Sequence, residues 1–316
     1  MEKEKKKDNK VSRVIRILLV VFLLVVFIYH RIMLKKEAPL REPLGQMVEV
    51  DGQKMSIYTE GEGEHTLIFM SGSGIGLPIL EYKPLYSLLS NDYKIVVIEK
   101  FGYGFSDVTD GERSFETILR QDREALSKAG IDGPFILCPH SMSGIEAILW
   151  AQTYPDEVEA IVGLDMSVPN SYSKDDFSWT KDLLTNFVAV GREIGLVRLF
   201  FPNSALPDSL TQNEKEIYRA IVNTKLINKN VRNEGKHILR AIEIINSQPK
   251  PDVPMLMFIS DGSQTGGESW IKALKDYASD LPGAQTIDLD CGHAVYELRQ
   301  EQISEEMREF IESLKK

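Results

Sequence analysis

The stretch FILCPHSMSGIEA, residues 135–147, places a serine hydroxyl where it could act as a nucleophile. An apolar, strand-like run stops at Pro139, Ser141 follows, and a helical pattern resumes after the small residues Ser143 and Gly144. In a parallel α/β sheet, ligands bind at the carboxyl ends of the strands, so a tight strand-to-helix corner there lifts its residue into the site. We therefore predict that Ser141 is a nucleophile, which requires a histidine to accept its proton.

Strands that alternate with helices must position this corner. A hairpin is expected to turn at Asp51-Gly52, and short apolar strands are expected in HTLIFM, YKIVVIE, FILC, EAIVGLDM, VPMLMFIS and AQTIDLDC. Helical patterns occupy SFETILRQDREALSKAG and residues 142–154, 267–280 and 296–315. This alternation predicts an α/β fold whose central sheet is mainly parallel, with helices on both faces.

A helical insertion interrupts the alternation between Met166 and Pro251, so residues 167–251 are predicted to form a cap. Its segment LLTNFVAVGREIGLVRLFFP carries more apolar side chains than a solvent-facing helix would show. Two interpretations stay open. The side chains either pack the cap onto the sheet domain, or some of them line a pocket over Ser141 for an apolar acyl chain.

The stretch around Ser141 resembles the nucleophile elbow of the α/β-hydrolase fold, in its form Gly-His-Ser-Met-Gly-Gly. The resemblance extends in order over nearly all of residues 47–316, and it implies a serine hydrolase with a Ser-Asp-His triad under a helical cap. Pro139 and Ser143 stand where the family usually has glycine. Proline can end a strand and serine is still small, so we expect the elbow to be preserved.

The resemblance implies that the acid and then the histidine follow the serine in the chain. Only His237 and His293 come late enough. His237 falls within a predicted cap helix, whereas His293 follows the last strand, so we favour His293 as the base.

The acid that orients the histidine is expected at the end of a strand. Asp261 ends the penultimate strand and precedes a glycine, the usual position in similar hydrolases, and we favour it. Asp165 ends the preceding strand and is the alternative acid.

A developing oxyanion needs hydrogen-bond donors. The resemblance implies the Met142 amide, which follows the nucleophile, and the loop FMSGSGIG, where the Ser73 amide is the second candidate. In that loop Ser71 replaces the family's histidine. The glycine-rich segment EKFGYGFSD matches another family stretch and is expected to be structural.

A serine nucleophile favours hydrolysis of a carboxylic ester through an acyl-serine intermediate. Acyl transfer, or amide and peptide cleavage, would use the same triad; relatives that cleave N-terminal proline carry a His-Gly-Gly-Pro-Gly loop, which is absent here. A non-catalytic binding module on this scaffold is a further alternative. We expect a small ester or lipid-like substrate, and no cofactor or metal.

The N-terminus predicts a single membrane anchor. Residues 1–13 form a basic tail, residues 14–34 a transmembrane segment and residues 35–46 a linker. The uncharged core of 14 residues, Ile17 to His30, is short for a span, but arginines at both ends can snorkel. A cleaved signal peptide and a buried core helix are the alternatives. Seven Lys or Arg residues up to Arg16 favour a cytoplasmic N-terminus and an external catalytic domain, as in a membrane-anchored bacterial protein.

Charge and cysteine content restrict the partners. Residues 1–41 hold 11 of the 37 Lys and Arg residues of the chain and 4 of its 47 Asp and Glu residues. Residues 42–316 therefore hold 26 Lys and Arg residues against 43 Asp and Glu residues. This acidic domain is not expected to bind nucleic acid. Cys138 and Cys291 are expected to be buried free thiols, with a disulfide between them as the alternative.

Overall fold

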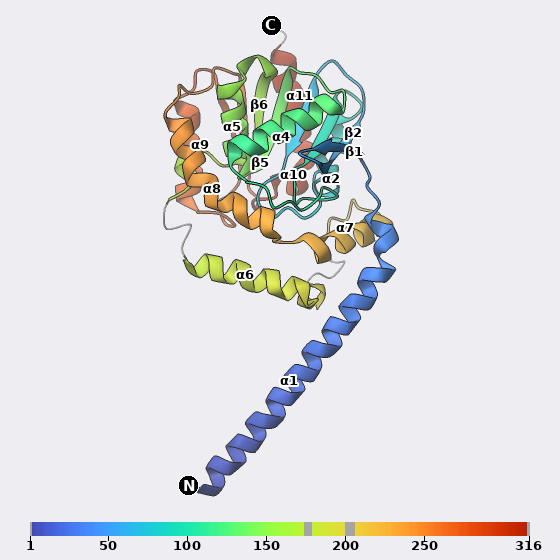
Figure 1. Ribbon diagram of the computed structural model, residues 1–316. Coiled ribbons are helices and arrows are strands. Elements are labelled where there is room, and N and C mark those ends of the chain that lie inside the picture. Colours follow the sequence, from blue (N-terminus) through green and yellow to red (C-terminus); the bar gives the residue numbers. More distant parts are fainter. Residues whose placement is uncertain (1, 174–178, 200–205, 315–316) are drawn as a thin grey trace.

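The fold is described by a computed structural model that covers residues 2–173, 179–199 and 206–314. In these residues eight strands form one sheet in the order β1-β2-β4-β3-β5-β6-β7-β8 (Figure 1). The strands are β1 (Gln46–Val50), β2 (Gln53–Glu60), β3 (Thr66–Met70), β4 (Lys94–Glu99), β5 (Phe135–Ser141), β6 (Val158–Met166), β7 (Met255–Ile259) and β8 (Gln285–Asp288). The pairs β1·β2 and β2·β4 are antiparallel, and all pairs from β4 to β8 are parallel, which confirms the predicted mainly parallel sheet.

Helices cover both faces of the sheet, as the alternation predicted. One face packs against α4 (Phe115–Lys128), α5 (Ser143–Thr153) and α9 (Glu268–Ser279). The other packs against α2 (Pro78–Glu81), α3 (Lys83–Leu89), α10 (Val295–Leu298) and α11 (Gln300–Ser313). Successive strand residues alternate between the two cores: Ile68 belongs to the first, and Leu67 and Phe69 belong to the second.

The predicted hairpin turn is present between β1 and β2. Asp51 and Gly52 both have positive φ, 51° and 71°. Two such residues in sequence match the twist of the flanking strands, as in a type I′ turn. The turn places β1 at the edge of the sheet, far from the Ser141 corner.

The cap follows β6 and lies across the end of the sheet at which β6 finishes (Figure 1). Its described elements are η3 (Pro169–Ser171), α6 (Trp179–Glu193), η5 (Leu196–Leu199), α7 (Gln212–Lys225) and α8 (Lys229–Asn246). All of these described elements are helical, and they lie between β6 and β7 in the chain.

A buried network of charges joins the cap to the sheet domain. Glu234 of α8 accepts hydrogen bonds from Arg113, at 2.8 Å, and from the Tyr103 hydroxyl, at 2.5 Å. Lys100 lies 3.5 Å from Glu234 and also pairs with Glu146 of α5. All five side chains are shielded from water, so each charge depends on its partners for solvation.

Replacing Glu234 with Ala is expected to lower the free energy of unfolding by about 3–5 kcal/mol, because it leaves the buried Arg113 guanidinium without its carboxylate. Chemical denaturation of the full chain in detergent would measure the loss. Glu243→Ala is the matched control, since its ion pair with Arg240 on the same helix is exposed and is expected to be worth less than about 1 kcal/mol. Equal losses in the two variants would contradict a structural role for the network.

The N-terminal helix α1 (Glu2–Lys36) extends away from the domain (Figure 1). Its stretch Val11–Lys36 is long and apolar enough to cross a membrane, and it contains the predicted segment 14–34. The helix continues through Lys36, and η1 (Ala38–Arg41) lies in what we predicted to be a linker. Most of its apolar side chains are exposed in the structure, unlike those of a buried core helix.

Candidate active site

Ser141 occupies a sharp corner between β5 and α5. Strand β5 continues through Ser141, so the expected strand end at Pro139 is wrong. Pro139 pairs with Met70 of β3 because its fixed φ suits an extended strand. The ladder to β6 shifts register between His140 and Ser141, and Ser141 has a φ of 54°. A positive φ is strained for a residue with a side chain, and such strain is concentrated at functional sites.

The small residues after Ser141 have different structural reasons. A Cβ on Gly144 would lie 2.1 Å from the Ser167 carbonyl oxygen, so only glycine allows α5 to pass β6 this closely. Ser143 is fully buried, and its Oγ accepts a hydrogen bond from His140 N at 3.0 Å and lies 2.9 Å from the Met70 carbonyl oxygen. The serine thus ties the corner to the end of β3, which explains why this position tolerates a departure from glycine.

His293 lies in the loop between β8 and α10 and is hydrogen-bonded to Asp165. Its Nδ1 is 2.6 Å from Asp165 Oδ2. If Nδ1 carries the proton that Asp165 accepts, Nε2 is the free basic nitrogen. The His293 backbone amide donates to Gln264 Oε1 at 3.1 Å, and this bond fixes the loop.

Asp165, the last residue but one of β6, is buried, and both of its carboxylate oxygens accept hydrogen bonds. Its Oδ1 accepts hydrogen bonds from the Ser260 amide and from Trp270 Nε1, both at 3.0 Å. Burial by itself would raise the pKa of Asp165, but the hydrogen bond and charge of His293 and the bonds from Ser260 hold that pKa below its ordinary value. The carboxylate is therefore ionised at neutral pH and suited to orient an imidazole.

The preference for Asp261 over Asp165 as the partner of His293 is wrong. Asp261 lies beyond the end of β7 with its side chain exposed, and its Oδ1 accepts from the Ser263 amide at 2.8 Å. The ladder pairs Leu164 with Phe258, so Asp165 lies level with the last residue of β7, whereas Asp261 is two residues further on. The carboxylate of Asp261 is used in a local turn instead.

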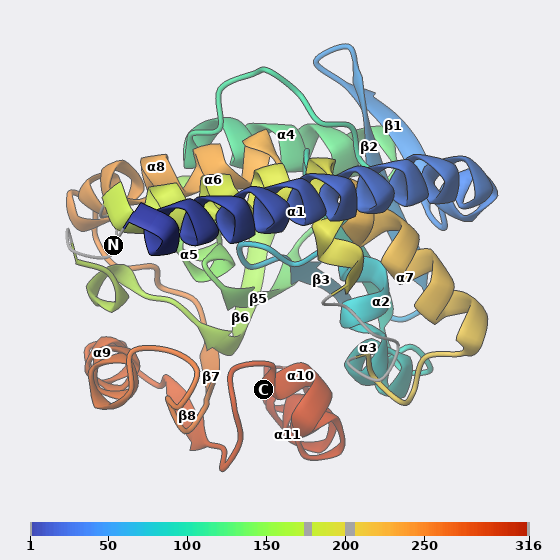
Figure 2. The same ribbon diagram turned by 90° about the horizontal axis from the view of Figure 1, so that it is seen from below.

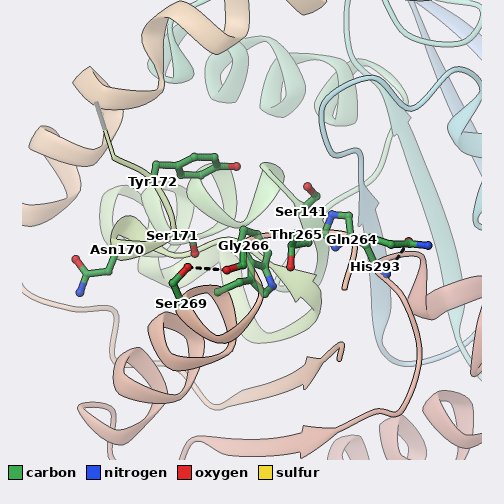
Figure 3. A pocket seen from close by; sticks show the side chains of 10 residues that line it. Ser141, Asn170, Ser171, Tyr172, Gln264, Thr265, Gly266, Ser269 and His293 are labelled. Carbon is green, nitrogen blue, oxygen red and sulfur yellow. Dashed lines mark hydrogen bonds between the residues drawn. The ribbon is translucent and has the colours of Figure 1, made fainter. Parts of the chain in front are cut away.

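Ser141 and His293 line the same cavity, of about 430 Å³ (Figure 3). Its other described walls come from the start of the cap, from the segment between β7 and α9, and from the first turn of α9: Asn170, Ser171, Tyr172, Gln264, Thr265, Gly266, Ser269 and Trp270. Among these lining residues none is Asp, Glu, Lys or Arg, and most offer neutral hydrogen-bonding groups. The cavity therefore suits an uncharged ligand with both apolar surface and hydrogen-bonding groups.

The apolar cap segment does not line this cavity in the part of the chain that the structure describes. Phe200 and Phe201 lie outside the described residues, as does the side chain of Leu184. Val197 is buried, whereas Leu183 and Phe187 are exposed on the outside of α6. The acyl-pocket interpretation of this segment is thus not supported by where its described side chains lie.

The two predicted oxyanion donors belong to segments next to Ser141. Met142 is the N-cap residue of α5, at the helix end where amides lack partners within the helix. The loop after β3 also approaches Ser141: a Cβ on Gly72 would lie 2.7 Å from Ser141 Cβ, and Ser73 is the next residue. The role of these amides stays a prediction.

Two residues that sequence reasoning missed support the His293 imidazole. The His140 ring lies 4.5 Å from it, centroid to centroid, and His140 Nε2 donates to the His293 carbonyl oxygen at 3.2 Å. Burial, aided by the charge of His293, lowers the pKa of His140 to about 3, so His140 stays neutral. Trp270 meets the same ring edge-on, at 5.6 Å. The histidine next to the nucleophile was the available signal, but nothing local pointed to Trp270.

Neither cysteine takes part in this site. Cys138 and Cys291 are both buried and free, which confirms the expectation of two free thiols. Among the described residues no group of three or more His, Cys, Asp or Glu side chains could hold a metal ion.

Comparison with known proteins places this chain among hydrolases. Residues 73–276 match the family model described as "Serine aminopeptidase, S33". The uncharacterized protein YbdG of Bacillus subtilis is 36% identical over 300 residues, which cover 92% of this chain and 92% of that protein.

Solved structures show the same fold at low identity. An epoxide hydrolase from Vigna radiata has a TM-score of 0.64 at 18% identity and covers 87% of this chain and 99% of its own. A structure from a study of carboxylesterases of Nitrososphaera gargenis has a TM-score of 0.62 at 14% identity and covers 85% of this chain and 99% of its own. The predicted α/β-hydrolase fold is confirmed, and with it the expectation that the protein is a hydrolase.

Proposed function

We propose that this chain, which belongs to the serine aminopeptidase S33 family of α/β-hydrolases, cleaves a carboxylic ester through an acyl-serine intermediate. The observation that carries this proposal is the hydrogen-bonded pair of His293 and Asp165 on the same cavity as Ser141. The nucleophile type separates this chain from fold relatives that attack epoxides or alkyl halides with an aspartate.

In the proposed reaction, Ser141 Oγ attacks the ester carbonyl carbon while His293 Nε2 takes the hydroxyl proton. Asp165 holds the imidazole and stabilises its charged form. The amides of Met142 and Ser73 would stabilise the oxyanion. His293 then returns the proton to the departing alcohol, and a water molecule, deprotonated by the same nitrogen, releases the carboxylic acid and restores Ser141.

The cavity walls support a compact, uncharged substrate with hydrogen-bonding groups. Acyl transfer to another alcohol, amide or peptide cleavage, and ligand binding without turnover remain alternatives that use the same residues. We also propose that α1 anchors the protein in the cell membrane, with the N-terminus cytoplasmic and the catalytic domain external.

A panel of p-nitrophenyl esters from C2 to C12, with aminoacyl p-nitroanilides alongside, tests the proposed chemistry on the full chain in detergent. An apolar acyl pocket would raise kcat/KM about fourfold for each methylene, at about 0.8 kcal/mol per buried group. Because only part of the cavity wall is apolar, we expect no such climb, a maximum at C2 to C4, and weaker cleavage of the anilides. Fastest turnover of the anilides would favour the peptidase alternative, and a climb through C12 would restore the acyl pocket.

A further inference from the structure

Helix α6 of the cap carries an apolar stripe on its outer face. Leu183, Phe187 and Val190 are 62%, 69% and 59% exposed. Their spacing of four and three residues puts them on one side of the helix. The inner side is occupied by Ala189 and Arg192, both buried, and Arg192 donates to the Leu226 carbonyl oxygen at the end of α7. The stripe therefore stays exposed although the opposite side of α6 is packed against the rest of the cap.

The stripe lies at the end of the domain from which the N-terminal helix extends. Figure 1 shows α6 at the end of the domain from which α1 extends, and Figure 2 shows α1 crossing in front of α6 in the view from below. In both views helix α6 lies on the side of the domain from which α1 extends.

A polar cluster between η5 and α1 indicates the depth in the membrane at which the α6 side of the domain would lie. Arg198 of η5 donates to His30 Nδ1 at 2.8 Å and to both carboxylate oxygens of Glu37, at 2.6 and 2.7 Å. Such an ion pair is costly inside hydrocarbon, so the cluster belongs at the level of the lipid headgroups. The apolar residues of α1 that precede His30 then lie in the acyl region. Because η5 follows α6 almost directly, α6 lies close to the same headgroup level.

The length of the span agrees with this placement. With His30 at the headgroup level, residues 11–29 form a helix of about 28 Å, close to the roughly 30 Å hydrocarbon core. Helix α1 therefore fills the acyl region up to the level of the Arg198 cluster, which lies in η5, directly after α6.

We infer that the stripe of Leu183, Phe187 and Val190 inserts into the headgroup–acyl boundary of the leaflet from which α1 emerges, as a second membrane contact. This inference rests on the proposed anchoring by α1 and not on the proposed ester chemistry. An amphipathic helix binds such an interface through its apolar face while its axis lies in the membrane plane. The contact would fix the orientation of the cap, and thereby hold the cavity beside Ser141 close to the lipid surface.

The inference can be tested by fluorescence quenching on the full chain in phosphatidylcholine nanodiscs. Phe187→Cys is labelled with the polarity-sensitive dye NBD, and doxyl-labelled lipid is the quencher. Val20→Cys, within the apolar part of α1, reports the anchor, and Glu305→Cys, exposed on α11, is the matched control on a distant helix. The unmodified chain treated with the dye gives the background from its two buried cysteines.

We expect a blue-shifted, quenchable emission at positions 187 and 20, and an unshifted, unquenched emission at position 305. Val190→Cys repeats the measurement if Phe187→Cys does not yield folded protein. Quenching at position 20 without quenching at 187 and 190 would overturn the inference and leave the anchor intact. No quenching at any position would overturn both. A dimer in size measurements, with positions 187 and 190 shielded but unquenched, would assign the stripe to a second copy of the chain and would also overturn the inference.

Discussion

Replacing Ser141 with Ala is expected to lower the turnover number for the best ester by about 10⁴–10⁶-fold, because it removes the nucleophile of acyl transfer. The change deletes one partly exposed oxygen atom and leaves the backbone hydrogen bonds of the corner in place, so the variant is expected to fold. Steady-state kinetics on the full chain in detergent would measure the loss. A fluorophosphonate probe should label the natural protein and fail to label the variant.

Ser127→Ala, which changes an exposed serine on α4, is the matched control for Ser141→Ala and should retain turnover and labelling. Retention of more than about a tenth of the activity in Ser141→Ala would contradict the assignment of the nucleophile. If the natural protein neither turns over an ester nor reacts with the probe, the binding-module alternative becomes the better interpretation of the same scaffold.

Replacing Asp165 with Asn is expected to lower the turnover number by roughly 10³–10⁴-fold. The amide has nearly the shape of the carboxylate, and Asn tolerates the positive φ of 50° at this position. It removes the charge that stabilises the imidazolium, however, and its NH₂ group favours the wrong tautomer of His293. Kinetics with the Ser141 test ester would measure this loss.

Asp261→Asn is the matched control for Asp165→Asn, because it makes the same change in the carboxylate at the end of the adjacent strand. Its side chain is exposed and bonded to the Ser263 amide, so we expect a loss of less than about tenfold. The opposite ranking of the two variants would return the acid to β7. Equal, small effects would show that the bond between Asp165 and His293 is not needed for turnover.

The sequence by itself determined the features of this protein that depend on local pattern. The hairpin at Asp51-Gly52 requires two residues that tolerate positive φ, and Asp-Gly supplies them. The corner at Ser141 follows from an apolar strand that meets a helix through small residues. The long helical insertion was recognisable because its periodicity differs from that of the flanking strands.

Only the tertiary structure decided which carboxylate faces His293. Asp165 and Asp261 both follow apolar stretches, and the local signal that we used, the glycine after Asp261, favoured the wrong residue. The register of β6 against β7 decides this, because it places Asp165 within hydrogen-bond distance of the Ser260 amide and Trp270 Nε1 and leaves Asp261 exposed to solvent. Such register is a relation between segments almost a hundred residues apart, and it is set by packing across the whole sheet.

The direction of the apolar cap side chains was likewise decided by tertiary packing. Composition indicated that the segment after Leu183 is too apolar for a solvated helix, but it could not say which face of the helix meets the protein. In the structure Ala189 and Arg192 are the buried residues of α6, with Arg192 bonded to the end of α7, and Phe187 and Val190 are left exposed. A helix can bury only one face against its own domain, and the contacts of its neighbours choose which face remains for another partner.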